Sequence, residues 1–425
     1  LPEIIEEYNN HLESFHIVKG NDKDNWFIID RLTNGQTKIT IYNIKDGKKG
    51  SKIQERVYDK KATKELWVYG LDDDDIFEVI GEKKQVIPLK LVGGQNHDEY
   101  RIESGNKVKM YDFKSKENTF LTKNGKIHLS DNYEMNTYNY KKYIQKRNII
   151  LPIIGYNPDD GFKLGVSSIL TRYGYNRNPF SQQHTLKAFY YFATNGFDIF
   201  YSGEFATILK NWNFYLKAHI TSPNYSVNFY GLGNETYNYE QDLDDDDDYH
   251  RVRYSTRIAY PSLKWKGRMG GEFDAGVLYE SVEVEKTEGR FIETVPNISE
   301  ERQHYVGINA SYKYENKDNE TFPSLGMIAT LDTGWKSNLN NDSNFSYITP
   351  SLAFAYKLDK HGKVVLATKF KGNIIIGSDY EFYHGASIGG KDGLRGYRNE
   401  RFTGDKSYYQ NTDIRYNIGN YKTSI

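Results

Sequence analysis

Cysteine is absent from the 425 residues, so the chain forms neither a disulfide framework nor a thiolate metal site. Long hydrophobic runs are absent as well, because no window approaches 18 consecutive apolar residues, and this excludes a transmembrane helix. A large net charge is also lacking: the formal value is −1, which gives no reason to expect nucleic acid as a partner. None of these absences excludes a membrane barrel, whose strands place only every second side chain in lipid.

Aromatic side chains are what the chain has in excess, with 37 Tyr, 22 Phe and an aromatic share of 15%. Two classes of protein fit this composition. One is a membrane barrel with aromatic girdles at its two interfaces. The other is a Tyr-rich soluble or surface-bound β-sandwich or propeller with carbohydrate-binding aromatics. The pattern of alternation along the chain favours the first class.

The first third of the chain predicts a helix followed by a small β domain. We expect a helical lead-in over residues 1–17, a β domain over 18–131, where short β runs are separated by turns rich in Gly, Asn and Asp, and a polar linker over 132–146. The chain starts at Leu1 without a signal-peptide pattern, and we expect a processed or incomplete start. The apolar side chains at helical spacing are Ile4, Ile5, Tyr8, Leu12 and Phe15.

Residues 147–425 are one series of long alternating segments. In residues 251–260 the alternation puts Arg251, Arg253 and Arg257 on one face and mainly apolar residues on the other. Because buried unpaired charge is costly, we expect the arginine face to line a polar lumen and the other face to meet lipid. Alternation predicts twelve strands: 147–157, 161–173, 184–195, 196–209, 212–223, 250–266, 270–286, 303–316, 325–337, 344–358, 363–379 and 405–419.

A glycine-rich stretch, residues 389–402, joins the eleventh and twelfth predicted strands and is long for a hairpin loop. Glycines let the backbone fold back tightly, so we interpret the arginine at the tip as a charge held in a fixed place. The tip consists of Gly393, Leu394, Arg395, Gly396 and Tyr397.

This stretch resembles the inward-folded sixth loop of the bacterial surface antigen superfamily, the outer-membrane barrels that insert or translocate other proteins. Residues 155–162, 228–236 and 322–327 are similar to that family's first hairpin, its Phe-Tyr-Gly-Leu-Gly-Asn stretch and its Pro-x-x-Gly strand start. The resemblance covers about residues 147–420. It implies an all-β fold with a transmembrane antiparallel β-barrel over 147–425, preceded by a small periplasmic β domain.

The same resemblance implies sixteen strands, of which about twelve are present, so we expect the last strands to be missing or supplied by another chain, since unpaired edges are not tolerated in lipid. In the family the thirteenth strand carries an aspartate that pairs with the loop arginine. In this chain the twelfth predicted strand offers Asp413 as a lumen partner for Arg395.

The resemblance further implies a place in the bacterial outer membrane, with the N-terminal domain in the periplasm. The expected partners are outer-membrane lipid, client or associated polypeptides, and outer-membrane assembly machinery or lipoproteins, and the expected role is outer-membrane protein assembly or export of an associated domain. Residues 64–72 and 91–94 are similar to the region before the barrel in Bacteroidetes-type fusions with an upstream metallophosphoesterase. The metal motifs of that enzyme are lacking, so we expect no catalytic site in this chain. The alternative role is a membrane anchor for such an effector domain.

Two acidic turns, residues 70–77 and 93–100, partly match the calcium repeat of stacked β rolls. Asp72, Asp74 and Asp98 are candidate ligands, because carboxylates and carbonyls on tight turns are what Ca²⁺ prefers. Asn96 replaces a motif glycine, so solvated turns are the alternative, and no other cofactor is expected. We interpret the aspartate run at 244–248 as a solvated loop.

Overall fold

The computed structural model describes residues 2–121, 124–142, 146–157, 161–177, 179–209, 211–237, 248–267, 269–390 and 393–418. The chain folds into two compact units, Leu1–Ile144 and Gln145–Ile425. Most of the predicted aspartate run, part of the predicted first hairpin, and positions 391 and 392 of the glycine-rich stretch lie outside the described residues.

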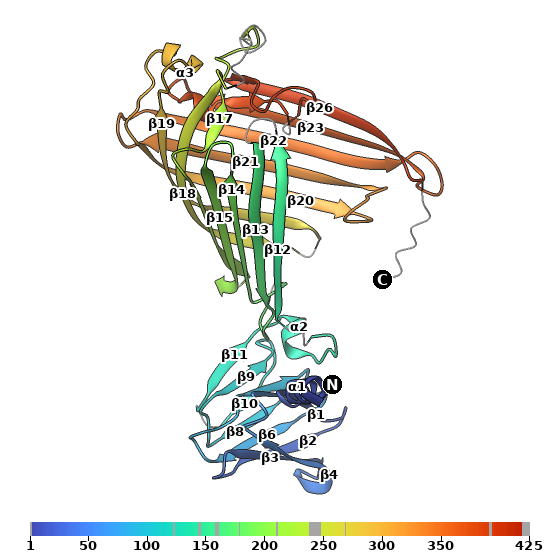
Figure 1. Ribbon diagram of the computed structural model, residues 1–425. Helices are drawn as coiled ribbons and strands as arrows, with labels where there is room; N and C mark the ends of the chain where they lie inside the picture. Colours follow the sequence, from blue (N-terminus) through green and yellow to red (C-terminus); the bar gives the residue numbers. More distant parts are fainter. Residues whose placement is uncertain are drawn as a thin grey trace. The chain divides into compact units, whose positions relative to one another are not determined.

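The N-terminal unit is built from two stacked sheets between which the chain passes back and forth (Figure 1). Successive strands alternate between the sheets, so most of the unit is a winding of parallel coils, interrupted by the antiparallel β2–β3–β4 meander. The five-stranded parallel sheet contains, in spatial order, β1 (Phe15–Lys19), β5 (Glu65–Leu71), β7 (Leu89–Gly94), β9 (Val108–Asp112) and β11 (Lys126–Leu129). The six-stranded sheet contains β10 (Thr119–Phe120), β8 (Glu99–Ile102), β6 (Ile76–Gly81), β2 (Asn25–Arg31), β3 (Gln36–Lys45) and β4 (Lys48–Asp59).

One aromatic side chain per coil holds this winding in register. Phe27, Phe77, Tyr100 and Phe120 occupy paired positions on neighbouring strands, and their rings stack at centroid distances of 4.8, 5.2 and 4.9 Å. Aromatic pairs at such distances stabilise beyond the area they bury. The rest of the core comes from the alternate apolar residues of both sheets.

The helix α1 (Pro2–Glu13) is shorter than the sequence predicts. Phe15 and His16 belong to β1, where Phe15 pairs with Glu65 and packs its ring edge-on against Trp67 at 4.8 Å. Residues 132–142, within the predicted polar linker, form ordered structure. They contain α2 (Tyr133–Asn136), and Lys142 is buried, with its Nζ donating to the carbonyl of Met135.

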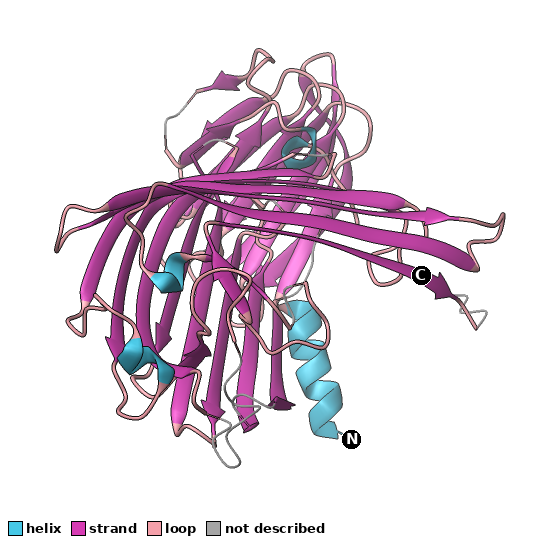
Figure 2. Cartoon of the chain, turned by 90° about the horizontal axis from the view of Figure 1, so that it is seen from above, coloured by secondary structure: helices cyan, strands magenta, loops and turns pink. Residues whose placement is uncertain are grey.

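The second unit is dominated by one antiparallel sheet whose twelve long strands lie side by side in chain order (Figures 1 and 2). All twelve strands predicted from alternation are confirmed, as is the class of fold. The strands are β12 (Arg147–Asn157), β13 (Gly161–Arg172), β14 (Gln182–Tyr191), β15 (Gly196–Leu209), β16 (Trp212–Thr221), β18 (Arg251–Lys266), β19 (Gly271–Glu285), β20 (Gln303–Lys317), β21 (Gly326–Asn338), β22 (Asn344–Lys357), β23 (Val364–Ile376) and β26 (Lys406–Tyr416), with the short β17 (Ser226–Asn228) beside β18. Among the described residues β12 and β26 do not pair with each other, so they are the edges of the sheet.

The two faces of this sheet differ in polarity. We call the face that carries Glu280 and Asp413 the inner face, because the loop segments between β23 and β26 contact it. The opposite, outer face presents large apolar side chains that are exposed, which is the pattern of strands facing lipid. They include Ile154, Leu164, Leu186, Ile199, Ile220, Val277, Ile308, Leu331, Leu352 and Ile414.

The prediction for the faces of β18 is wrong. Ile258 pairs with Glu280, and the ring of Tyr254 lies 5.6 Å from that of Tyr383 in η2 (Phe382–His384), so the large apolar residues in the first part of this strand face inward. Arg251, Arg253 and Arg257 therefore lie on the outer face. The start of β18 packs inward against apolar loop residues. Its inner face is therefore apolar and its outer face polar, the reverse of the usual pattern of a membrane strand.

A cluster of apolar residues from strands and loops fills the inner face at this end of the sheet. The contributing loop elements are α3 (Phe291–Thr294), η2 (Phe382–His384), and the hairpin of β24 (Ala386–Ile388) and β25 (Phe402–Gly404). Phe229 packs its ring 4.4 Å from that of Phe382. No helix among the described residues is long and apolar enough to cross a membrane.

Candidate functional site

The candidate site is the glycine-rich loop between β24 and β25, which folds against the inner face of the sheet. The two strands pair from Ala386 with Gly404 to Ile388 with Phe402, and this short hairpin fixes both ends of the loop. The turn at the tip is closed by a hydrogen bond from the amide of Tyr397 to the carbonyl of Leu394.

Two glycines of the loop are required by its backbone. Gly393 has a φ of +119°, and a Cβ there would lie 2.5 Å from the ring of Tyr409. Gly396, at the turn, has a φ of +95°, a conformation that side chains with a Cβ rarely adopt. The loop therefore approaches β26 with its bare backbone.

Arg395 lies at the loop tip with 76% of its side chain exposed. Its Nη1 is 3.4 Å from Oδ1 of Asp413 on β26, and the other carboxylate oxygen of Asp413 is 3.5 Å from Nη2 of Arg415. The structure thus brings together the predicted arginine and the predicted lumen carboxylate. The contact is long and open to solvent, so it contributes little energy by itself. Tyr397 packs its ring 5.5 Å from Phe402 at the base of the loop.

Arg401 makes the strongest attachment of the loop. Its Nη1 donates to Oγ1 of Thr236 at 2.7 Å and its Nη2 to the carbonyl of Thr236 at 2.6 Å. The guanidinium also lies over the rings of Tyr230 and Phe402, at 4.8 and 4.6 Å from their centroids. A planar guanidinium is suited to this combination of two parallel donors and two aromatic faces.

The preceding residues of the loop extend this attachment. Oε2 of Glu400 accepts from the amide of Asn228 at 3.0 Å, and the side-chain amide of Asn228 donates to the carbonyl of Asn399 at 3.2 Å. The amide of Gly233 donates to the carbonyl of Thr403 at 2.8 Å. The two stretches that the sequence marked separately, 228–236 and 389–402, therefore form one structure.

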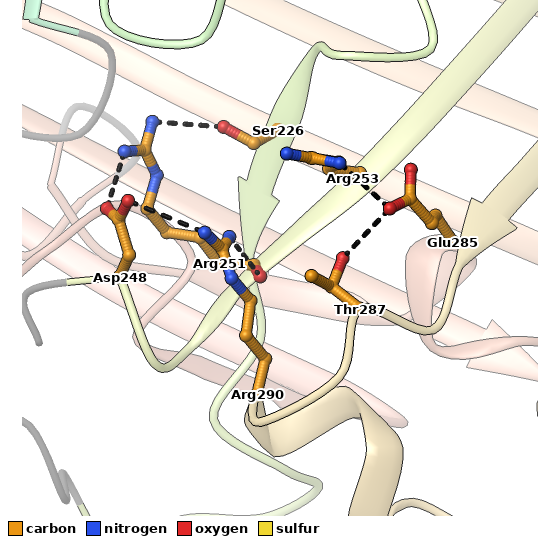
Figure 3. A network of polar contacts seen from close by, with 7 residues as sticks. All are labelled: Ser226, Asp248, Arg251, Arg253, Glu285, Thr287 and Arg290. Atoms are coloured by element: carbon orange, nitrogen blue, oxygen red, sulfur yellow. Dashed lines mark hydrogen bonds and ion pairs between the residues drawn. The ribbon is translucent and has the colours of Figure 1, made fainter.

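A network of arginines holds the strand that leads into residues 228–236 (Figure 3). Arg251 donates to Asp248 at 2.6 Å and to Oγ of Ser226 on β17 at 3.0 Å. Arg290 lies 3.5 Å from the same carboxylate and donates to the carbonyl of Arg251 at 3.2 Å. These contacts fix β17 against β18, which positions the receiving surface for Arg401.

A buried ion cluster fixes the segment that enters the loop. Oε2 of Glu280 on β19 accepts from Nζ of Lys336 on β21 at 2.6 Å and lies 2.9 Å from Nε2 of His384 in η2. The side chains of Glu280 and His384 are 6% and 5% exposed. Rings of Tyr305, Phe345 and Tyr383 surround His384 at 4.6–4.8 Å. Burial makes this contact far stronger than the exposed pair at the loop tip.

The three residues predicted to bind calcium lie in different environments. Oδ1 of Asp72 accepts from Asn96, and Oδ1 of Asp74 accepts from the amide of His97, both on the surface of the N-terminal unit. Asp98 is fully buried. Within the described ranges no three His, Cys, Asp or Glu side chains are placed to hold a metal ion, and calcium stays a prediction.

Asp98 belongs instead to a column of side chains, one per coil. The amide of Asn25 donates to Asp75 at 2.8 Å, that of Asp75 to Asp98 at 3.0 Å, and that of Asp98 to Asn118 at 2.9 Å. Burial, reinforced by Asp98, raises the pKa of Asp75 to about 9. Burial, reinforced by Asp112, also raises the pKa of Asp98. Burial therefore favours the protonated form of both inner members of the column.

Sequence reasoning found the loop tip but missed its attachments. Arg401, Thr236, Glu280 and His384 were not predicted, because their contacts join residues 104–165 positions apart. The usable signal for Arg401 is its place at the end of the glycine-rich stretch.

A curved antiparallel sheet with an apolar exposed face, an inner polar face and an inward-docked loop defines the class of outer-membrane β-barrels. The family model described as the Omp85 superfamily domain matches residues 193–420, and the chain belongs to this superfamily. It is thus an outer-membrane β-barrel of this superfamily.

The chain is similar in structure to BamA from Haemophilus ducreyi lacking POTRA domains 1–3, with 15% identity over 60% of this chain and 47% of that chain and a TM-score of 0.44. It spans about half the length of that protein. It is also similar to the outer membrane protein OmpT of Vibrio cholerae in its trimer form, with 9% identity over 60% of this chain and 80% of that one and a TM-score of 0.31. No curated protein sequence matches the chain.

Replacing Arg401 by Lys is expected to loosen the loop, because an ammonium cannot make both hydrogen bonds to Thr236 while lying over two rings. We expect a loss of about 1–3 kcal/mol in docking free energy. Hydrogen exchange of residues 393–403 measures it, and Arg415→Lys on β26 is the control. Equal protection in both variants would show that Arg401 does not hold the loop.

Proposed function

We propose that the protein acts in outer-membrane protein assembly or in the export of an associated domain, with the docked loop holding the barrel in one state. The supporting observation is that residues 389–402 attach to the sheet at three separate places: Asp413, residues 228–236 and, through η2, Glu280. A loop attached in this way acts as a brace across the inner face. Client polypeptides and assembly lipoproteins are the partners that this role implies.

The edges of the sheet support a further part of the proposal. Among the described residues, β12 and β26 each pair with a neighbouring strand on one side only. Such edges are not tolerated in lipid, where each unsatisfied group costs several kcal/mol. We propose that additional strands, from the same protein or another chain, close the sheet in the membrane.

The alternative is a membrane anchor for an effector domain, with no catalytic residue in this chain. The N-terminal unit favours it, because two stacked sheets, one parallel and one mixed, differ from the POTRA units, each with two helices on a small sheet, that bind client chains in the best-known relatives. A periplasmic place for this unit, and a Bacteroidetes-type fusion to a metallophosphoesterase, belong to this proposal. Deletion of the gene separates the two roles: other barrels assemble normally if the protein is only an anchor.

Replacing Arg395 by Ala is expected to slow client folding several-fold in liposomes that contain the full-length protein, without changing strand content. The physical reason is that the loop tip loses its only charged contact with β26 among the described residues. Arg172→Ala, at the exposed end of β13, is the matched control. An Arg395→Ala protein with undiminished activity would show that the loop tip is not needed for the function.

A further inference from the structure

The outer side of the five-stranded sheet in the N-terminal unit carries a row of lysines that its own fold does not explain. Lys90 on β7 pairs in register with Lys109 on β9, and Lys109 pairs with Lys126 on β11. Neighbouring strands lie about 4.7–4.9 Å apart, so three ammonium groups project from adjacent positions. Like charges directly opposite one another destabilise a sheet.

The fold compensates only the first of these charges. Lys90 is anchored by an ion pair with Glu65 and lies over the ring of Trp67, at 5.1 Å from its centroid. Burial, reinforced by Lys109 and Lys142, lowers the pKa of Lys90 to about 7. Lys109 and Lys126 are exposed, and neither forms an ion pair with a carboxylate in the part of the chain that the structure describes.

These lysines line a groove rather than a flat surface. A cavity of about 640 Å³ crosses the starts of β5, β7, β9 and β11. Its lining includes four lysines, Lys90, Lys107, Lys109 and Lys126, and one carboxylate, Glu65, beside apolar residues and two glycines. The next row of side chains, two positions further along the strands, is covered. Tyr69 and Tyr111 are buried, and the ring of Tyr138 lies 5.4 Å from that of Tyr69.

We propose that this groove binds a ligand bearing two or three anionic groups repeated at about the spacing of the strands, 4.7–4.9 Å. Carboxylates of an acidic oligosaccharide and phosphates of a phosphorylated chain share this chemistry. The anions would lie over Lys90, Lys109 and Lys126. They would relieve the repulsion among the three ammonium groups, which the fold itself does not fully compensate. The site is separate from the docked loop and independent of the insertion or anchoring role.

The test is a calorimetric titration of the full chain in uncharged detergent at low ionic strength, where such contacts are least screened. The probes are trigalacturonate, tripolyphosphate and neutral maltotriose. We expect one or both anionic probes to bind, and the tighter of the two identifies the source of the charge. In the double variant Lys109→Gln, Lys126→Gln the affinity is expected to fall about tenfold.

The matched control is Lys45→Gln, Lys48→Gln, a pair of exposed lysines in register on the other sheet, which removes the same charge. Affinity within about twofold of the unaltered protein is expected there, since tenfold corresponds to 1.4 kcal/mol. Equal losses in both double variants would reduce the effect to net charge and overturn the proposal. Binding of the anionic probes no stronger than that of maltotriose would also overturn it.

Discussion

Replacing Glu280 by Ala is expected to release η2 and the entrance of the glycine-rich loop from the sheet. The change leaves Lys336 and His384 buried without their shared carboxylate, from which they lie 2.6 and 2.9 Å away. Breaking a buried ion pair by removing one partner costs about 3–5 kcal/mol. Local opening of residues 380–388 should therefore become at least about a hundredfold more frequent.

Hydrogen exchange of residues 380–388 in the detergent-solubilised protein measures this opening. Glu285→Ala is the control on the same strand, because its carboxylate is 47% exposed and pairs only with Arg253 among the ion pairs of the described residues. An exposed pair of that kind contributes no more than about 1 kcal/mol. Similar exchange in the two variants would mean that apolar packing alone holds η2.

The N-terminal unit is expected to become more stable as the pH falls from about 9 towards about 4. In the folded state the pKa of Asp75 is raised to about 9 and that of Asp98 is also raised, whereas in the unfolded chain both lie near 4. The folded state therefore holds more protons in this window. Stability from these groups is complete below the unfolded pKa and is lost as the pH rises through the folded pKa.

The double variant Asp75→Asn, Asp98→Asn provides the test. Asn25 and Asn118 already occupy the ends of the column, and the side-chain amide of Asn118 donates to the carbonyl of Phe113, so Asn reproduces a protonated Asp here. Denaturant unfolding of the full chain, followed by hydrogen exchange in residues 65–112, should show a flatter pH dependence in the variant.

Comparison with the variant is needed because other groups act in the opposite direction. The lowered pKa values of Lys90 and His128 make stability fall as the pH drops through their folded pKa values. The difference between the two proteins removes these contributions. A difference that does not change with pH would mean that Asp75 and Asp98 are ionised in the folded protein.

The sequence predicts the second unit well because a membrane strand has a simple physical signature. Alternation of apolar and polar residues depends on one neighbouring surface, lipid, that is the same for every strand. It fails at Arg251 and Arg253, where β18 reaches into the apolar loop cluster and the inner face becomes the drier one. Alternation shows that two faces differ, but it does not show which face meets water.

The N-terminal unit was harder to predict, since its order depends on stacking between coils. The short β runs and acidic turns were visible, but the column from Asn25 to Asn118 joins residues 20–50 positions apart along the chain. The sequence marks Asp98 as a candidate calcium ligand, whereas in the column it accepts a hydrogen bond from the amide of Asp75. Asp75, its neighbour in the column, is equally buried, but nothing distinguishes it in the sequence from the three aspartates before it.

Winding the N-terminal unit from coils that touch mainly their nearest neighbours has a mechanical consequence. Stability in such an array is close to a sum over coils and the interfaces between them. A pull on β11 is therefore resisted first by β9 alone, and the unit should lengthen in steps, one coil at a time. The aromatic stack from Phe27 to Phe120 makes those steps similar in force. Under tension along the chain, the unit would thus extend gradually, as one coil after another detaches.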